Sequence, residues 1–267
     1  MSLRRVFLLV DKERKLFFRG KKPLLLALML AGLGLLQFVL LSSGETFETT
    51  GFGAILYGSY NLFVQLLPLA LTSVLAGSVC QEKEDRTWFF YTSKTFTKAE
   101  IVLSKIFFYT GVMSVAVTLA WVVTIGVAWQ SAGGVDVPRL GIVYLLMVVL
   151  SVSFMITCME IAVSAVSSKT SLAGLAIVIV WFVLFPINLL APPWLGREYI
   201  APYAYNSIQT GTVMRILGMV PVASGCPFCE SFSPTFPTLA DIARTCLYTV
   251  TNAAVFIFIG LVGVRRN

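Results

Sequence analysis

The residue types that most often do chemistry in active sites are scarce in this chain. None of its 267 residues is a histidine, which removes the commonest general base and metal ligand. The sequence also lacks a GxxxxGK[ST] phosphate loop, a GxSxG nucleophile turn and an HExxH zinc motif. We therefore expect no catalytic site, no metal and no cofactor within the chain itself, and we expect no ATP to be bound by it alone.

One cysteine pair stands in a polar stretch, as Cys226-Pro-Phe-Cys229. Such a spacing is compatible with a disulfide, with half of a metal site or with a redox pair. A thioredoxin-like role needs a βαβ setting, which the surrounding residues do not offer. We favour a local disulfide, with a soft metal as the alternative. The other cysteines lie in or beside apolar runs, where packing is the expected role: Cys80, Cys158 and Cys246.

Several polar or aromatic side chains interrupt long apolar runs. Tyr57, Asn61 and Gln65 are spaced i, i+4, i+8 and so share one face of a helix. Polar groups inside a bilayer usually face protein or water. They line a transport pathway or hydrogen-bond neighbouring helices, and the pattern leaves both interpretations open. The full set of pathway candidates is Tyr57, Asn61, Gln65, Thr72, Trp181, Phe185 and Asn188.

Glu160 is an acid within an apolar run. Ionisable groups inside a membrane are costly and are functional candidates by default. We favour structural pairing with a base near the membrane surface, or a neutral carboxyl group, over a role in handling substrate or protons.

Residues 81–105 form a charged island between two apolar runs. The island carries five bases (Lys83, Arg86, Lys94, Lys98, Lys105) and four acids (Glu82, Glu84, Asp85, Glu100), and the aromatic run beginning at Trp88. Acids at the start and bases toward the end suit a helix dipole. The pattern predicts a short amphipathic helix at the inner face of a membrane, held by another protein.

The elements that position these residues follow from composition. The chain is 57% hydrophobic and 12% charged, whereas soluble domains carry about 25% charged residues. This predicts an all-α polytopic membrane protein. Six apolar runs are each long enough to span: 24–41, 55–79, 106–128, 140–164, 172–190 and 242–264.

Two further segments complete one predicted membrane domain covering residues 1–267. Residues 1–22 hold eight basic residues, with Val6, Phe7, Val10, Phe17 and Phe18 at roughly helical spacing, which predicts an amphipathic interface helix rather than a signal peptide. Residues 191–241 predict a small outer cap with a short helix over 204–220.

The basic residues set the expected orientation. With six spans both termini share a side, and that side collects sixteen of the 20 Lys and Arg residues, including those of the island. The positive-inside rule then places both termini and the island on the cytoplasmic side of the membrane. We expect this membrane to be the cell membrane, that is, the inner or plasma membrane. The charges gather at the ends of apolar runs, so we expect lipid and no nucleic acid as a partner.

The island resembles a motif of the ABC-2 type (type V exporter fold) ABC transporter permeases, E-x-x-x-G-T followed by P-x-S-R-x-E-I-x-x-x-K. Arg86 stands where that family usually has Gly, and Thr95 where it usually has Pro. Residues 161–170 resemble the family's tight turn between the fourth and fifth spans. The matching positions are Glu82, Thr87, Lys98, Glu100, Ile101 and Lys105, with Thr97 where the family often has Ser.

The resemblance implies a permease subunit of an ATP-driven exporter. Two permease subunits, identical or different, would pair, and two separate ATPase subunits would carry the ATP and Mg²⁺. In the family the second and fifth spans line the substrate route. The pathway candidates in this chain are a mixture of aromatic and amide side chains, which suits an amphiphilic lipid, peptide or drug-like molecule better than a small ion. A lipid-modifying membrane enzyme or a non-transporting anchor is the alternative. The residues implied in coupling to the ATPase are Glu82, Glu84, Arg86, Thr87, Trp88, Lys98, Glu100 and Lys105.

Overall fold

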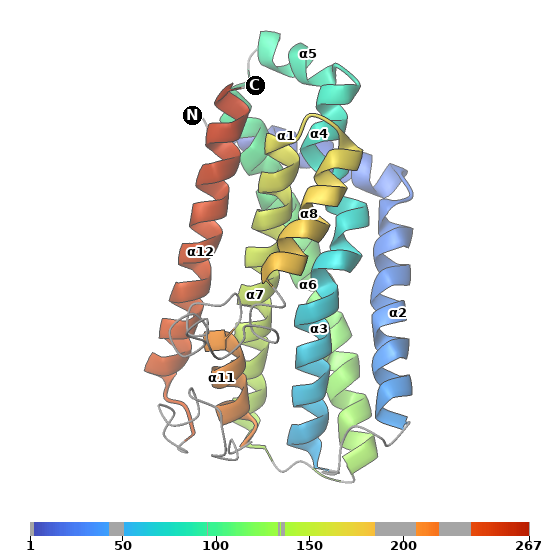
Figure 1. The fold of residues 1–267 in the computed structure, drawn as a ribbon, viewed down its shortest axis with the longest axis vertical. Coiled ribbons are helices and arrows are strands. Elements are labelled where there is room, and N and C mark those ends of the chain that lie inside the picture. Colours follow the sequence, from blue (N-terminus) through green and yellow to red (C-terminus); the bar gives the residue numbers. More distant parts are fainter. Residues whose placement is uncertain are drawn as a thin grey trace.

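The computed structural model describes residues 3–42, 51–94, 96–132, 134, 137–184, 207–218 and 236–266. Within these residues all regular elements are α-helices, which confirms the all-α prediction. The helices are α1 (Leu3–Arg19), α2 (Lys22–Ser42), α3 (Phe52–Leu75), α4 (Gly77–Glu84), α5 (Thr87–Lys94), α6 (Lys98–Ala132), α7 (Arg139–Val166), α8 (Thr170–Leu184), α11 (Ser207–Ile216) and α12 (Leu239–Arg266) (Figure 1).

Among the described residues, four helices are long and apolar enough to cross a membrane: Phe52–Glu84, Lys98–Ala132, Arg139–Val166 and Leu239–Val264. Shorter apolar helical stretches lie at Lys22–Gly32 and Thr170–Trp181, within α2 and α8. The chain is thus a membrane-embedded helical protein. Four of the six predicted spans reach full length in these helices, while the predicted run 172–190 extends beyond the described residues.

Helix α7 lies at the centre of the bundle and packs against α12, α6, α3, α4, α8 and α11. Small residues bring α7 and α12 close together. A Cβ atom added to Gly260 of α12 would lie 3.2 Å from the Cα atom of Ala162. Small residues at such crossings let helix backbones approach closely, which is how membrane helices gain packing energy without a hydrophobic driving force between them.

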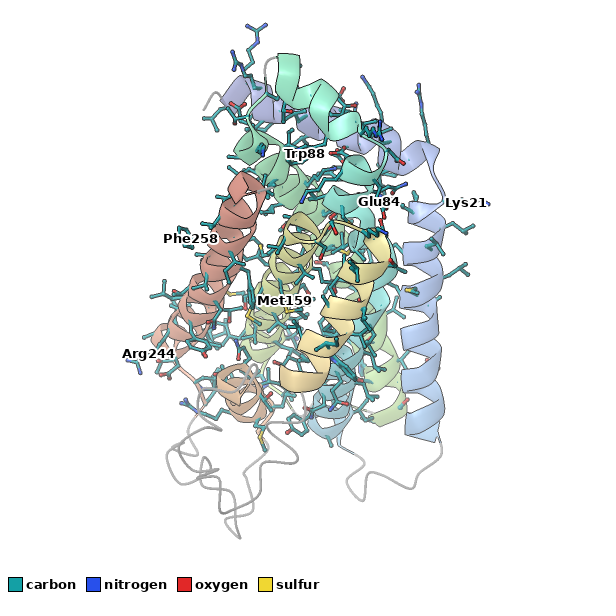
Figure 2. The ribbon with its side chains drawn as sticks, turned by 45° about the horizontal axis from the view of Figure 1, so that its top comes forward. Lys21, Glu84, Trp88, Met159, Arg244 and Phe258 are labelled. Carbon is teal, nitrogen blue, oxygen red and sulfur yellow. The ribbon has the colours of Figure 1, made fainter. Side chains whose placement is uncertain are left out.

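Large apolar side chains remain exposed on the outer faces of the bundle. Val123 of α6 and Phe258 of α12 expose 65% and 67% of their surface, and Figure 2 shows Phe258 pointing away from the bundle. Such faces would be a liability in water, but lipid is a matching solvent for them. Other exposed members of this set are Leu119, Leu172, Leu175, Ile179 and Leu247.

Helix α1 lies across one end of the bundle, and α4, α5 and both ends of the described chain lie at the same end (Figures 1 and 2). We call this the α1 end. The structure buries Val6, Leu9, Glu13 and Phe17 of α1. Of the apolar residues singled out in the sequence, Val6 and Phe17 are buried against the bundle, whereas Phe7 and Phe18 are exposed.

The charged island is not one short helix. It comprises the end of α4, the whole of α5 and the first two turns of α6. Arg86 separates helices α4 and α5. Its φ is 56°, in the left-handed region, which does not continue a right-handed helix. Thr97 and Glu100 then start α6 as a reciprocal cap: the Thr97 N–H donates to the Glu100 carboxylate at 2.9 Å, and the Glu100 N–H donates to Thr97 Oγ1 at 3.2 Å.

Helix α11 lies within the short helix predicted over 204–220. It packs on α12 through hydrogen bonds spaced along both helices. The Gln209 amide donates to Thr249 Oγ1 at 2.9 Å, and the Thr212 and Thr245 hydroxyls lie 2.8 Å apart. Most of the predicted outer cap, residues 191–206 and 219–235, lies outside the described residues.

Candidate functional site

A buried ionic cluster joins three helices at the α1 end. The Lys105 ammonium of α6 lies 2.8 Å from Glu13 Oε1 of α1 and 3.1 Å from Glu82 Oε1 of α4. Lys12 of α1 also reaches Glu82 Oε1, at 2.8 Å. Lys105 is 2% exposed and Glu13 is 5% exposed. Each buried charge therefore depends on its partners, since an unpaired ion at such a site is strongly unfavourable.

Aromatic side chains surround this cluster. Lys12 Nζ lies 3.7 Å from the ring centroid of Tyr91 in α5, a cation–π distance. Phe17 packs edge-on against Phe108 and Tyr109 of α6, with centroids 5.5 and 6.1 Å apart. The interface helix α1 is thereby attached to α4, α5 and α6, and these four elements are connected as one assembly.

The more exposed face of α1 carries surface ion pairs. Asp11 lies there, 2.7 Å from Lys15. The hydrogen bond from Lys15 lowers the pKa of Asp11. Exposed pairs of this kind add little stability, so the buried cluster, and not the surface charges, fixes the position of α1.

Helix α4 also holds the turn between α7 and α8. The Lys83 ammonium donates to the carbonyl oxygens of Ala165 and Ser167, at the end of α7. The Glu84 carboxylate accepts from the N–H and the hydroxyl of Thr170, at 3.1 and 2.6 Å, where α8 begins. A cation at a helix C-terminus and an anion at a helix N-terminus both match the helix dipoles.

The hydroxyl of Ser164 fastens α7 to the junction between α3 and α4. It donates to the Ala76 carbonyl oxygen at 2.7 Å. It also accepts from the N–H groups of Val79 and Cys80 at 3.0 and 3.2 Å. These N–H groups lie in the first turn of α4, where a helix offers them no partner of its own. The turn at 161–170, singled out in the sequence, is thus the part of α7 that fixes α4.

The exposed tip of the island is short. Gln81, Glu84, Asp85, Arg86 and Thr87 are exposed, and we call the last three the island tip. The Thr87 hydroxyl donates to the Glu82 carbonyl oxygen at 3.2 Å, which closes the tip onto α4. Trp88, next along the chain, is 4% exposed, and Figure 2 shows it inside the α1 end.

The residues that the resemblance implied in coupling therefore divide into two groups. Glu100 and Lys105 are buried, Glu82 is mostly enclosed and Lys98 is half-buried. Glu100 caps α6, and Glu82 and Lys105 belong to the cluster. Trp88 is buried as well. Glu84, Arg86 and Thr87 are exposed, so a second protein can reach them directly.

The polar stripe on α3 is half-buried over Tyr57, Asn61, Gln65 and Thr72. Two of these side chains bond to their own helix: the Asn61 amide to the Tyr57 carbonyl oxygen, and the Thr72 hydroxyl to the Pro68 carbonyl oxygen. Within the described part of the chain, these two hydrogen bonds stay inside α3 and do not join it to another helix.

Helix α8 borders this stripe. A Cβ atom on Gly174 would lie 3.8 Å from Thr72 Cγ2. Helices α3 and α8 run in opposite directions (Figure 1), and Trp181, two turns further along α8, is half-buried. The remaining pathway candidates, Phe185 and Asn188, lie outside the described residues.

Glu160 is fully buried in α7. Neither of its carboxylate oxygens has a hydrogen-bond partner among the described residues, and no ion pair joins it to a base there. The favoured expectation of pairing with a base is not met in this part of the chain, which leaves the alternative of a neutral carboxyl group. It shares a buried polar face of α7 with Thr157 and Ser164.

Three of the five cysteines lie in the described part of the chain. Cys80 and Cys158 are buried and Cys246 is half-buried, all three as free thiols, in agreement with packing. Cys226 and Cys229 lie outside the described residues. Within the described part, no group of three or more Cys, Asp or Glu side chains is arranged to hold a metal ion.

Sequence reasoning missed three members of these networks. Lys12 and Glu13 were counted only as charges of a basic helix, although Glu13 stands four residues from both Leu9 and Phe17 on the buried face. That spacing was the available signal. Ser164 had no signal beyond its place in the turn motif, because its partners are backbone groups more than eighty residues away.

Comparison with known proteins adds no relative. No family model matches the chain, and no curated protein is significantly similar to it.

Proposed function

We propose that this chain is the permease subunit of an ATP-driven exporter of the ABC-2 type. It pairs with a second permease subunit, and each permease docks a separate ATPase that supplies ATP hydrolysis. The island tip contacts the ATPase, and α4 and α6 pass its motion to the membrane helices. The cargo is an amphiphilic molecule such as a lipid or a peptide.

The buried ionic cluster is the observation that carries this proposal. A force applied to the island tip has to reach the membrane helices without being absorbed by a flexible loop. Glu82, in the last turn of α4 beside the tip, is clamped to Lys105 of α6 and Lys12 of α1. A push on the tip therefore moves α1, α4 and α6 together.

A second set of contacts leads from the tip to the remaining helices. Lys83 and Glu84 hold the ends of α7 and α8, and Ser164 holds the break between α3 and α4. A shift of α4 would thus tilt α7 and α8 relative to α3. Since the stripe from Tyr57 to Thr72 lies beside α8, this is the movement that would open a route along that stripe.

The placement of the tip fits such a partner. The first and last described residues lie at the same end of the bundle as the island (Figure 1). The excess of Lys and Arg at this end favours the cytoplasmic side, where ATP is available. The lipid-modifying enzyme is less well supported, because the buried acids of this end, Glu13 and Glu82, are engaged in ion pairs with Lys105 and Lys12.

The proposal is tested by charge reversal at the tip. Asp85 is exposed and lies outside the buried cluster. We expect Asp85→Lys combined with Thr87→Glu to lower the amount of ATPase subunit that co-purifies with the chain from its native membranes at least fivefold. The basal abundance of the chain should not change. The matched control is Arg244→Glu, an exposed site at the opposite end (Figure 2).

The co-purified protein is identified as an ATPase by its sequence and by its binding of ATP. It should carry a phosphate-loop sequence and be labelled by a photoreactive ATP analogue. If no such protein accompanies the wild-type chain, or if the tip variant and the Arg244 variant retain it equally, the proposal is wrong.

A further inference from the structure

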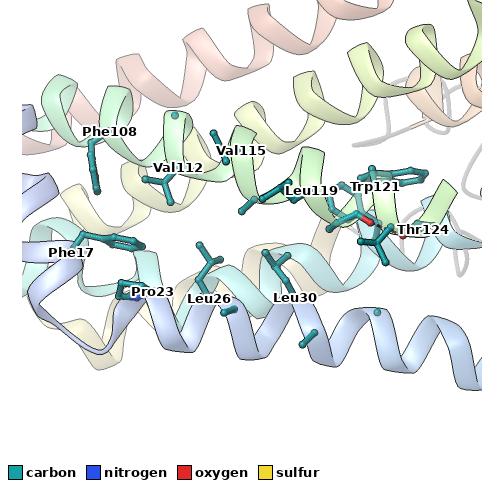
Figure 3. A pocket seen from close by; sticks show the side chains of 18 of the residues that line it. Phe17, Pro23, Leu26, Leu30, Phe108, Val112, Val115, Leu119, Trp121 and Thr124 are labelled. Atoms are coloured by element: carbon teal, nitrogen blue, oxygen red, sulfur yellow. Dashed lines mark hydrogen bonds between the residues drawn. The ribbon is translucent and has the colours of Figure 1, made fainter. Parts of the chain in front are cut away.

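A long apolar groove of about 1000 Å³ lies between α2 and α6. Figure 3 shows Leu26 and Leu30 of α2 facing Val112 and Leu119 of α6 across it. Trp121 and Phe63 line its far part, and Phe17 and Phe18 of α1 line the end nearest α1. Its volume is at the upper end of the range for small-molecule pockets, roughly 300–1,000 Å³.

The lining selects hydrocarbon along the whole length of the groove. Thr124 is the polar side chain among the described lining residues, and its hydroxyl donates to the Ala120 carbonyl oxygen of its own helix. Glycine keeps the groove wide, since a Cβ atom on Gly111 would meet no atom within 4 Å. A chain of methylene groups fits such a lining, whereas a polar cargo would lose its hydration without compensation.

The end of the groove near α1 is basic. The turn between α1 and α2 places Arg19, Lys21 and Lys22 between two lining segments, Phe17–Phe18 and Pro23. Arg19 and Lys21 are exposed, and Figure 2 shows Lys21 directed away from the bundle. Lys22 is half-buried and donates to the Tyr109 hydroxyl at 3.3 Å.

No described acid neutralises this turn by direct contact. Glu13 and Glu82, the nearest acids of the cluster, are bound to Lys105 and Lys12. The N-terminus of α2 adds the positive end of a helix dipole to the same turn. The groove therefore combines a hydrocarbon slot with a cationic mouth.

We propose that the groove binds one anionic phospholipid, with its phosphate at Arg19, Lys21 and Lys22 and an acyl chain between α2 and α6. The lined part of α6, from Phe107 to Val127, rises about 30 Å, comparable to the hydrocarbon thickness of a bilayer of about 30 Å. An acyl chain that starts at the basic turn runs past Val112 and Val115 toward the middle of the groove.

A second copy of this chain is a poorer occupant. Copies related by a two-fold axis along the membrane normal would bring their basic turns to the same depth. Close approach through this groove would then set Arg19, Lys21 and Lys22 of one copy near those of the other, with like-charge repulsion. An anionic headgroup has the complementary charge.

The first test fills the groove. The purified chain is titrated in detergent with phosphatidylglycerol and with phosphatidylcholine, and bound lipid is counted by native mass spectrometry. We expect one phosphatidylglycerol per chain, bound at least fivefold more tightly than phosphatidylcholine. Gly111→Phe should remove this binding, while Gly126→Phe should not. Gly126 also lies on α6 with open space at its Cβ position, but it does not line the groove.

The second test changes the mouth. Lys21→Glu should weaken phosphatidylglycerol binding about fivefold or more, since each basic residue near an anionic lipid surface contributes about that factor. Arg4→Glu, the same charge change at the far end of α1, should leave it unaltered. Equal binding of the two lipids, retained binding in Gly111→Phe, or dimers that vanish in Gly111→Phe without any lipid selectivity would each overturn the proposal.

Discussion

At the scale of single residues, Lys105 has the greatest effect on the α1 end. Its ammonium lies within 3.1 Å of carboxylates from two helices, Glu13 of α1 and Glu82 of α4, and Lys12 contacts the same two carboxylates from a more exposed position. The Lys105 ammonium is enclosed, so its loss leaves two carboxylates with too little compensating charge. The family resemblance implied a role for this lysine in coupling, and the structure shows it bound to Glu13 and Glu82 inside the chain.

We expect Lys105→Met to destabilise the folded chain by about 3–5 kcal/mol, the usual result of removing one partner from a buried ion pair. Lys15→Met is the control, because Lys15 pairs with Asp11 on the exposed face of α1, and should have little effect. Chemical unfolding in detergent measures both. Combining Lys105→Met with Glu13→Gln should recover part of the lost free energy of unfolding. If the destabilisations of the two single variants add fully in the double variant, Lys105 and Glu13 are not coupled as proposed.

Arg86 affects local structure through its backbone conformation. Its φ of 56° costs an L-amino acid about 1–2 kcal/mol relative to the right-handed region, whereas glycine adopts it freely. The exporter motif that the island resembles usually has glycine at this position, and here an arginine adopts the left-handed conformation that glycine favours.

We therefore expect Arg86→Gly to be neutral or to stabilise the chain by up to about 1 kcal/mol. Arg86→Val should destabilise it, because a β-branched residue is a rare outlier at positive φ. Thermal unfolding of the two variants decides the matter. Equal destabilisation by glycine and valine would show that the guanidinium group, and not the backbone, matters here.

At the scale of elements, the short helix α4 connects the others. It touches α3, α5, α7 and α8, and two side chains at its C-terminal end, Lys83 and Glu84, bind the turn between α7 and α8. The junction between α3 and α4 is held by one hydroxyl, that of Ser164. Without that hydroxyl the N–H groups of Val79 and Cys80 would lose an acceptor in a buried place.

Ser164→Ala should cost about 2–3 kcal/mol, as expected when buried donors are left unsatisfied. Ser153→Ala is a matched control: Ser153 is also buried in α7, but its hydroxyl bonds only to the Val149 carbonyl oxygen of its own helix. Hydrogen exchange at Val79 and Cys80 should rise in the first variant alone. Unchanged protection there would contradict the assigned role of Ser164.

At the scale of the whole molecule, the bundle has two chemically different ends. The α1 end holds the island, the interface helix and the ends of the described chain, and the other end holds α11 and the start of α12 (Figure 1). We propose that the α1 end is cytoplasmic. The groove proposed for lipid is lined mainly by α2 and α6, whereas the island tip joins α4 to α5.

Sidedness is tested by cysteine labelling in intact cells, in a background where the native cysteines are replaced by serine. An impermeant maleimide should label Arg244→Cys and not Thr87→Cys, since both positions are exposed but lie at opposite ends. After permeabilisation both should react. Labelling of Thr87→Cys in intact cells would place the island outside and remove the basis for an ATPase partner.

Much of the helical layout was predictable from sequence. Apolar runs of about twenty residues and their polar ends predicted helices close to α2, α7 and α12, because span length and hydropathy are local properties. The predicted third span began at residue 106, whereas α6 begins at Lys98. The Thr97–Glu100 cap is a local signal for that start, but the charged residues around it were assigned to the island and not to the membrane helix. The partners of Glu13 and Ser164 could not be predicted, since they depend on contacts between residues far apart in the chain.

The most direct measurement is site-specific photo-cross-linking from the island tip. A photoreactive amino acid at position 87 should join the chain, in native membranes, to a protein that binds ATP, and the yield should change when a non-hydrolysable ATP analogue is added. The same group at position 244 should give no such product. If position 87 yields only lipid or no adduct while the chain remains folded, the island tip does not dock an ATPase and the transporter account is wrong.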